Sequence, residues 1–149
     1  MIDDEYAAFV AAFRAEHREL QKSVQTLGRV LDKSRSWSQK ASNEAAEALA
    51  AMEKHLRRHF AQEETGGYLE EALAVAPRFS HEAAQLLDQH SVMLRAAKEA
   101  LESARRSSDA VTWEKLKSEV ASLIAAVLAH ENAEDRIVQQ ALNSGEEPT

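Results

Sequence analysis

The residues in this sequence whose types and spacing could do chemistry are histidines and glutamates four positions apart. His59 precedes Glu63 by four positions, and His130 precedes Glu134 by the same spacing near the C-terminus. On an α-helix this spacing puts an imidazole and a carboxylate on one face, one turn apart. Two other amphipathic stretches each carry one histidine in the apolar stripe. We interpret the set as a metal site inside a four-helix bundle, with the predicted ligands His17, His59, Glu63, His90, His130 and Glu134.

The composition predicts an all-α protein with one domain. The chain has 149 residues with only 4 Gly and 2 Pro, and it is rich in Ala, Leu, Glu, Lys, Arg and Gln, which favour helices. It contains no cysteine. Any metal ion must therefore be held by nitrogen and oxygen ligands.

Charge and hydropathy limit the kinds of partner. The net charge of −7 argues against binding to a phosphate backbone, so no nucleic-acid partner is expected. No apolar run approaches the ~20 residues of a membrane span, and the first residues lack the basic and apolar regions of a signal peptide. We therefore expect a soluble cytoplasmic protein with no membrane partner.

Apolar residues at spacings of three and four predict four long helices joined as an up-and-down antiparallel bundle. A short cap helix is predicted between the second and third long helices, because paired glycines precede this stretch and a proline follows it. The bundle is predicted over residues 1–142, followed by a flexible tail over residues 143–149. The predicted helices cover approximately residues 4–33, 42–64, 68–75, 80–106 and 112–142.

The four predicted ligand histidines fall at one depth in such a bundle. In the first and third long helices the histidine lies about 16 residues before the next turn, and in the second and fourth about 18 residues after the preceding turn. At about 1.5 Å per residue, each histidine is roughly 25 Å from the same end of the bundle. The two halves of the chain also repeat, which predicts a pseudo-two-fold set of four imidazoles and two carboxylates around the axis.

Each of these residues has a simpler interpretation when it is taken alone. A single histidine in an apolar stripe is more often a core residue, and a glutamate there often extends its carboxylate to solvent. However, burying two unpaired carboxylates would cost several kcal/mol each, and a divalent cation would offset that cost. The convergence of four histidines at one depth therefore favours a metal site. Imidazole and carboxylate ligands without thiolate suit Fe, Mn or Zn.

The sequence does not have the ligand motif of the ferritin-like di-iron proteins. That motif is Glu-x-x-His on two helices of the bundle. No histidine in this chain has a glutamate three positions earlier. The ferritin-like class is therefore not expected.

Four segments that together cover nearly the whole chain resemble another family of bundles. They are Glu16-His17, the run from His59 to Glu64, the run from Leu87 to His90, and His130-Glu131-x-x-Glu134. In combination they resemble the hemerythrin family, also called the HHE cation-binding domain. The resemblance implies a non-heme di-iron centre in which carboxylates bridge two Fe ions, with Zn or Mn as possible alternatives. It implicates the same six residues as ligands.

Two positions depart from the oxygen-carrying members of that family. Those members have His-x-x-x-His on the third helix, whereas Leu86 and Leu94 flank His90 at that spacing. They also end with His-x-x-x-x-Asp, which Asp135 would complete, whereas Glu134 fits the His-x-x-x-Glu of divergent members. Adjacent helical side chains point about 100° apart, so only one of the two faces inward, and we choose Glu134. The departures argue against an oxygen carrier and leave the fold unchanged.

Three other residues lie close to the predicted ligands in the sequence. The sequence leaves three roles open for His55, which lies one turn before His59. It is expected to be a further ligand, a neighbour that supports a ligand, or a partly exposed polar residue. Tyr68 in the cap could approach the metal ions, although core packing is the simpler expectation. Glu64 is expected to face solvent or the cap.

The predicted function is that of a di-iron protein whose partner is a small molecule. It would bind, sense or react with O2, NO or peroxide, or it would handle iron. The alternative is a structural or partner-binding helical bundle with zinc or no metal. No substrate pocket or general base stands out beyond the metal ligands, so no catalytic residue is predicted, and enzymatic turnover and oligomeric state stay open.

Overall fold

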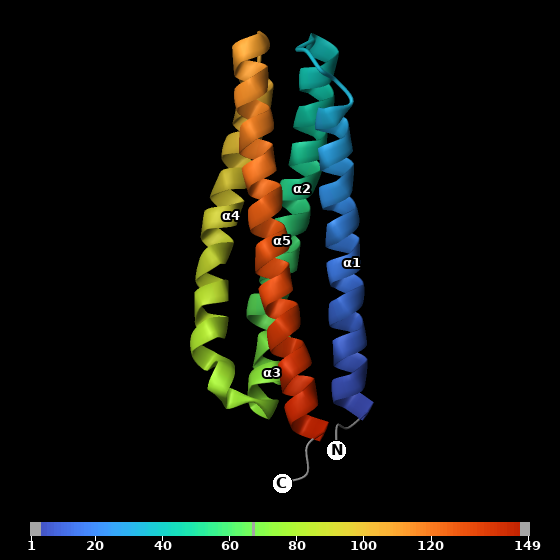
Figure 1. The fold of residues 1–149 in the computed structure, drawn as a ribbon, viewed down its shortest axis with the longest axis vertical. Coiled ribbons are helices and arrows are strands. Elements are labelled where there is room, and N and C mark those ends of the chain that lie inside the picture. Colours follow the sequence, from blue (N-terminus) through green and yellow to red (C-terminus); the bar gives the residue numbers. More distant parts are fainter. Residues whose placement is uncertain (1–3, 67, 147–149) are drawn as a thin grey trace.

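The computed structural model describes residues 4–66 and 68–146, and within them it confirms the predicted all-α bundle. Figure 1 shows four long helices that run side by side, with a short helix that follows the second of them at one end. The long helices are α1 (Asp4–Asp32), α2 (Gln39–Gly66), α4 (Ser80–Arg106) and α5 (Ala110–Glu146). The short elements are α3 (Tyr68–Val75) and the 3-10 turn η1 (Pro77–Phe79).

The long helices are arranged in a closed square. Helix α1 packs on α2, α2 on α4, α4 on α5, and α5 back on α1. Both termini and α3 lie at one end, and the α1–α2 and α4–α5 connections lie at the other, as the up-and-down topology requires (Figure 1). Short connections force neighbouring helices to be antiparallel, so residues far apart in the sequence meet at one depth.

The bounds of the helices differ from the sequence-based expectation mainly at the C-terminus. Helix α5 continues to Glu146, so residues 143–146 of the predicted tail are helical, while residues 147–149 lie outside the described residues. Of the paired glycines predicted to end the second helix, Gly66 is its last residue and Gly67 is not described. Within the described ranges, no helix is both long and apolar enough to cross a membrane.

Two apolar clusters fill the interior, and the predicted ligands lie between them. The larger cluster extends toward the two connections, and the histidine-bearing helices enter it at Leu20, Met93 and Val127. The smaller cluster lies toward the termini and includes Phe13 and Leu86. Because His17 lies between Phe13 and Leu20 in sequence, and His90 between Leu86 and Met93, both histidines belong to the layer that separates the clusters.

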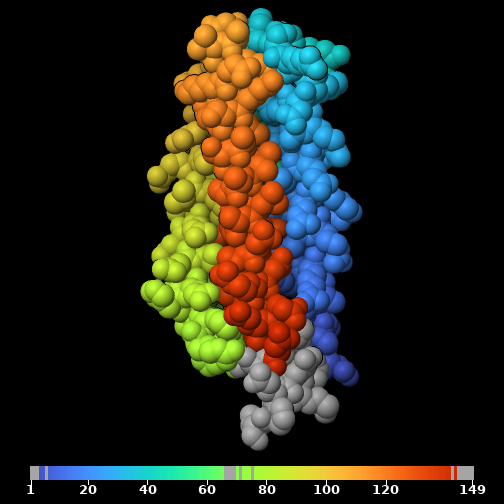
Figure 2. All heavy atoms as spheres, viewed as in Figure 1, coloured from blue at the N-terminus to red at the C-terminus, as the bar shows by residue number. Residues whose placement is uncertain are grey.

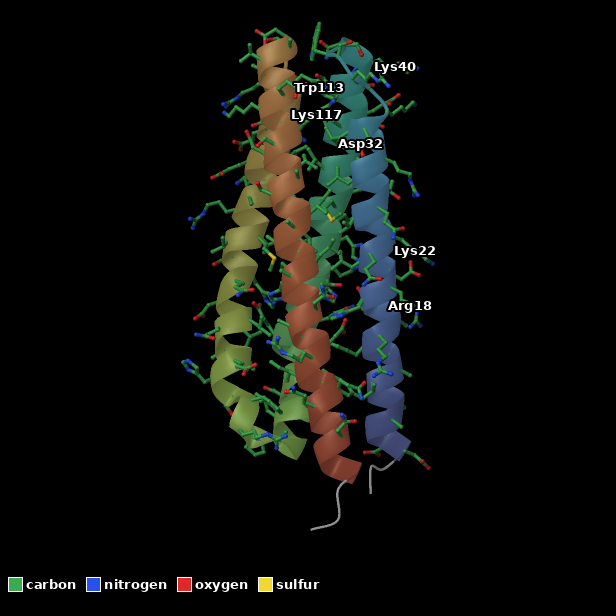
Figure 3. The ribbon with its side chains drawn as sticks, in the orientation of Figure 1. Arg18, Lys22, Asp32, Lys40, Trp113 and Lys117 are labelled. Carbon is green, nitrogen blue, oxygen red and sulfur yellow. The ribbon has the colours of Figure 1, made fainter. Side chains whose placement is uncertain are left out.

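Tryptophans and a helix cap hold the end of the bundle that carries the connections. The Trp113 indole is buried and donates a hydrogen bond to the Ser34 carbonyl oxygen at 3.3 Å, which links α5 to the α1–α2 connection (Figure 3). The Asp109 carboxylate accepts the backbone N–H of Thr112 at 2.8 Å, which caps α5 and lowers the pKa of Asp109. These contacts fix the register of α5 against its neighbours.

Because Trp113 lies at the end away from the predicted ligands, its loss should lower stability without changing the metal content. We expect Trp113→Ala to reduce the free energy of unfolding by about 3–5 kcal/mol, the usual cost of truncating a large buried aromatic residue. Urea unfolding and elemental analysis would measure the two quantities. Val111→Ala is the control, since Val111 is 77% exposed and its truncation should have little effect. Loss of metal in folded Trp113→Ala protein would contradict the prediction that metal binding does not depend on Trp113.

Candidate metal centre

The six predicted ligands converge in one buried layer of the bundle. Together with Glu131, they form two groups in which the ligand atoms lie within 4.8 Å of one another. In Figure 3, Arg18 marks the depth of its sequence neighbour His17, and nitrogen- and oxygen-bearing side chains lie between the ribbons there. One group is His17, His59, Glu131 and Glu134, and the other is Glu63, His90, His130 and Glu134.

Two glutamates join the groups. One oxygen of Glu63 lies 2.6 Å from His59 Nε2, and its other oxygen lies 3.0 Å from His90 Nε2. One oxygen of Glu134 lies 3.6 Å from His17 Nε2 and 3.3 Å from His130 Nε2. Each carboxylate therefore faces one imidazole from each half of the bundle, which is the arrangement that a ligand shared by two cations requires.

Glu131 is a buried member of the first group that the sequence interpretation did not choose as a ligand. Its oxygens lie 3.3 Å from His59 Nε2 and 3.8 Å from His17 Nδ1. The sequence does contain a pattern that predicts the inward position of Glu131. Val127, Glu131 and Glu134 follow one another at spacings of four and three, as residues on one face of a helix do. The four-residue spacing from His130 to Glu134 does not by itself reveal that Glu131 also faces inward.

The layer contains ionisable atoms whose hydrogen-bonding capacity is unused. Within the described part of the chain, both oxygens of Glu63, Glu131 and Glu134 are buried without a hydrogen-bond partner, as are Nε2 of His17 and His59. Leaving a buried polar atom unpaired costs about 1–3 kcal/mol, and more for a charged group. Carboxylate oxygens and imidazole nitrogens directed at a common point would all be satisfied by a cation. This donor set fits a divalent metal ion without thiolate ligands.

A ring of hydrogen bonds holds the outer side of each histidine. In every case Nδ1 donates to a side chain on the preceding helix around the square, which leaves Nε2 to face the centre. His17 donates to Asp135 at 2.8 Å and His59 to Glu16 at 3.3 Å. His90 donates to Glu64 at 3.0 Å and His130 to Gln89 at 2.9 Å.

The ring repeats with the same pseudo-two-fold pattern as the ligands. Glu16 and Gln89 each immediately precede a histidine, and Glu64 and Asp135 each follow one by five positions. Three of these four acceptors are carboxylates, and Gln89 is a neutral amide. A carboxylate that accepts from Nδ1 makes the imidazole a more basic metal ligand than an amide does. The two halves therefore differ in charge at the single position occupied by Gln89.

The structure also places the residues that the sequence left open. Glu134 is fully buried in both groups, whereas the Asp135 side chain is 40% exposed and lies outside them. Glu64 is half exposed, as expected, but it also accepts the hydrogen bond from His90. The side chain of Tyr68 lies outside the described part of the structure.

His55 lies beside the centre without joining either group. Its Nδ1 lies 2.8 Å from Ser23 Oγ, and its Nε2 lies 3.4 Å from the same Glu16 oxygen that contacts His59. His55 thus supports the carboxylate that supports His59. Of its three possible roles, this geometry corresponds to the neighbour that holds another residue in place.

Aromatic rings close the layer on its apolar sides. The Phe60 ring stacks on His90 with 4.0 Å between centroids and 6° between planes. The Phe13 ring lies 4.1 Å from the His17 ring. Rings at these positions restrict the rotation of the imidazoles and keep the centre out of bulk water.

Burial and mutual contact shift the pKa values in the layer. Burial opposes the charged form of His59, but contacts with Glu131 and Glu63 outweigh it and raise the pKa of His59 to about 10. Burial and the adjacent Glu63 carboxylate raise the pKa of Glu134 well above its ordinary value. Burial also opposes ionisation of Glu63, but contacts with Glu134 and three histidines lower its pKa. Without a cation, His59 therefore holds an extra proton at neutral pH, and ionisation of Glu134 is disfavoured.

Comparison with known proteins identifies one family. The family model of the hemerythrin HHE cation binding domain matches residues 8–142, which is most of the chain and includes both groups. No curated protein and no solved structure gives a significant match.

A metal ion that binds His59 must displace the extra proton that His59 holds at neutral pH. We therefore predict that binding releases protons and strengthens as pH rises. Near pH 7 about one proton per chain should be released from His59, whose pKa is raised to about 10 without a cation. Titration calorimetry in two buffers with different ionisation enthalpies would measure the number. Heats of binding that do not depend on the buffer would contradict this prediction.

Proposed function

The chain belongs to the hemerythrin HHE cation-binding domain family, and we propose that it is a non-heme di-iron protein that binds or reacts with a small molecule such as O2, NO or peroxide. His17, His59 and Glu131 would hold one iron ion, and His90 and His130 would hold the other. Glu63 and Glu134 would be shared by both ions. The observation that carries the proposal is the position of these two carboxylates, each facing an imidazole from both groups.

The charge of the layer supports two ions over one. Three buried glutamates carry three negative charges when ionised, and the four histidines are neutral when they act as ligands. One divalent ion would leave a net negative charge in the core, whereas two would leave one positive charge, open to neutralisation by a small anionic ligand. The three carboxylates of the outer ring add negative charge nearby, which favours the second cation further.

The two proposed positions differ in the number of side chains that surround them. Among the described residues, the histidines that Glu131 contacts are His17 and His59. If Glu63 and Glu134 are shared, the first position would have five ligands from the protein and the His90 and His130 position four. Leu86 and Leu94, which flank His90 by one turn on either side, cannot supply a ligand. Iron at this position would have open coordination and would supply redox chemistry toward a small molecule. The protein supplies fixed imidazoles, carboxylates and the exclusion of water.

Elemental analysis of protein purified without added metal tests the two-iron assignment. We expect about two irons per chain in the wild type and at most about one in Glu63→Ala and in Glu134→Ala, because the remaining cations would lose a shared anion and repel each other. Glu131→Ala should weaken only one position. Ferric absorption in the near-ultraviolet should fall in parallel.

Asp88→Ala is the matched control, because it removes an exposed carboxylate two residues from His90. Its iron content should equal that of the wild type. Zinc or no metal in the wild type would instead support the structural bundle that the sequence left as the alternative. Two irons retained in folded Glu134→Ala protein would show that Glu134 is not shared.

We also predict that removal of the metal lowers the melting temperature without unfolding the protein at 25 °C. An ion that binds only the folded state stabilises it by mass action, which accounts for the lower melting temperature. The larger apolar cluster lies outside the metal layer, which accounts for the retained fold. Circular dichroism before and after chelation, with metal loss verified by elemental analysis, would measure both effects. An unchanged melting curve after complete removal of metal would oppose the prediction.

A further inference from the structure

The surface seam between α4 and α5 contains a groove that reaches the proposed centre. It has a volume of about 350 Å³, and the buried His130 is among its lining residues. In Figure 2, α5 faces the viewer with α4 beside it, so the seam can be followed along the molecule. His130 belongs to the proposed position that lacks a contact with Glu131, whose oxygens lie near His17 and His59. The groove therefore leads from solvent to the half of the centre where an open position is proposed.

The lining of this groove is small and uncharged. Helix α5 contributes Ala126, Ala129 and Ala133, and among the described residues the lining contains no Asp, Glu, Lys or Arg side chain. A molecule that enters here need not displace water from a charged group. By contrast, the groove between α1 and α5, which reaches His17, is lined by three arginines and Asp135.

The hydrogen bond that closes the α4–α5 seam is the neutral one in the ring. Gln89 lines the groove and accepts from His130 Nδ1, whereas carboxylates accept from the other three histidines. Hydrogen bonds to a charged acceptor are roughly twice as strong as those between neutral groups. Displacement of the Gln89 side chain therefore costs less than displacement of any of the other three acceptors.

From these observations we infer that the α4–α5 groove is the entry route and outer binding site for a small uncharged molecule. The molecule would pass Gln89 and His130 to the position next to His90 and His130. The volume of the groove, about 350 Å³, far exceeds the roughly 30 Å³ that one water molecule occupies in the liquid, so the groove has room for a diatomic molecule. This inference rests on the proposed function, because it assigns the route by which that function's ligand arrives.

The route can be tested without iron by using xenon, an apolar atom of similar size. We expect xenon pressure to shift the methyl NMR signals of Ala126, Ala129 and Ala133 in the metal-free protein. Ala129→Trp should fill the groove and abolish the shifts at the other two alanines. Ala15→Trp, the same change at an exposed site on α1, should leave them intact. Absence of xenon shifts in the wild-type groove would overturn the outer binding site.

The second arm uses iron-loaded protein and nitric oxide in a stopped-flow instrument. Ala129→Trp should lower the association rate constant at least about tenfold and change the dissociation constant by less than about threefold, because the route and not the site is altered. Ala15→Trp should match the wild type. Iron content and melting temperature would verify that each variant is folded and loaded with iron. Ala126→Trp is a second variant that should fill the groove.

The outcomes separate this inference from the proposed function. If nitric oxide binds at the wild-type rate in both groove variants, the route is wrong while the di-iron assignment stands. If the purified protein holds no iron, the proposed function fails, and the xenon measurement still decides whether the groove takes up an apolar molecule. Slower nitric oxide binding together with lost xenon shifts supports the entry route.

Discussion

The burial of three glutamates on the axis of the bundle is the constraint on which the remaining structure depends. Glu63, Glu131 and Glu134 are enclosed without hydrogen-bond partners among the described residues, and burying such groups unpaired costs free energy. The fold supports the layer from both sides, with the larger apolar cluster toward the connections and the smaller toward the termini. A cation satisfies the carboxylates, while the two clusters supply the stability that the polar layer does not. The bundle is therefore a scaffold that holds an unfavourable layer in place.

The sequence was sufficient to predict the layer because helix geometry converts residue spacing into position. Short connections and a constant rise per residue put His17, His59, His90 and His130 at one depth. The four-residue spacing then placed Glu63 and Glu134 beside them. Adjacent residues on a helix point in different directions, which separates Glu134 inside the centre from Asp135 on its outer side.

What spacing could not predict was contact between helices. Whether Glu131 faces the centre depends on the rotation of α5 about its own axis, which several neighbours decide together. The acceptors of the outer ring likewise belong to different helices from their histidines, so no motif within one helix reveals the pairs of His59 with Glu16 or of His90 with Glu64. Long-range side-chain pairs require the packed structure, whereas the positions of the six predicted ligands required only the periodicity.

The repeat between the two halves explains why the centre has two unequal sides. If the symmetry were complete, both positions would have the same ligands and the same outer acceptors. It is broken by Glu131, which adds a carboxylate to the first group, and by Gln89, which replaces a carboxylate beside the second. If Glu63 and Glu134 are shared by two ions as proposed, these differences would leave the His90 and His130 side with one ligand fewer and less negative charge nearby. In the proposed di-iron protein, one ion would then be held mainly by the protein, while the other, beside an uncharged groove, would be the one able to accept a small molecule.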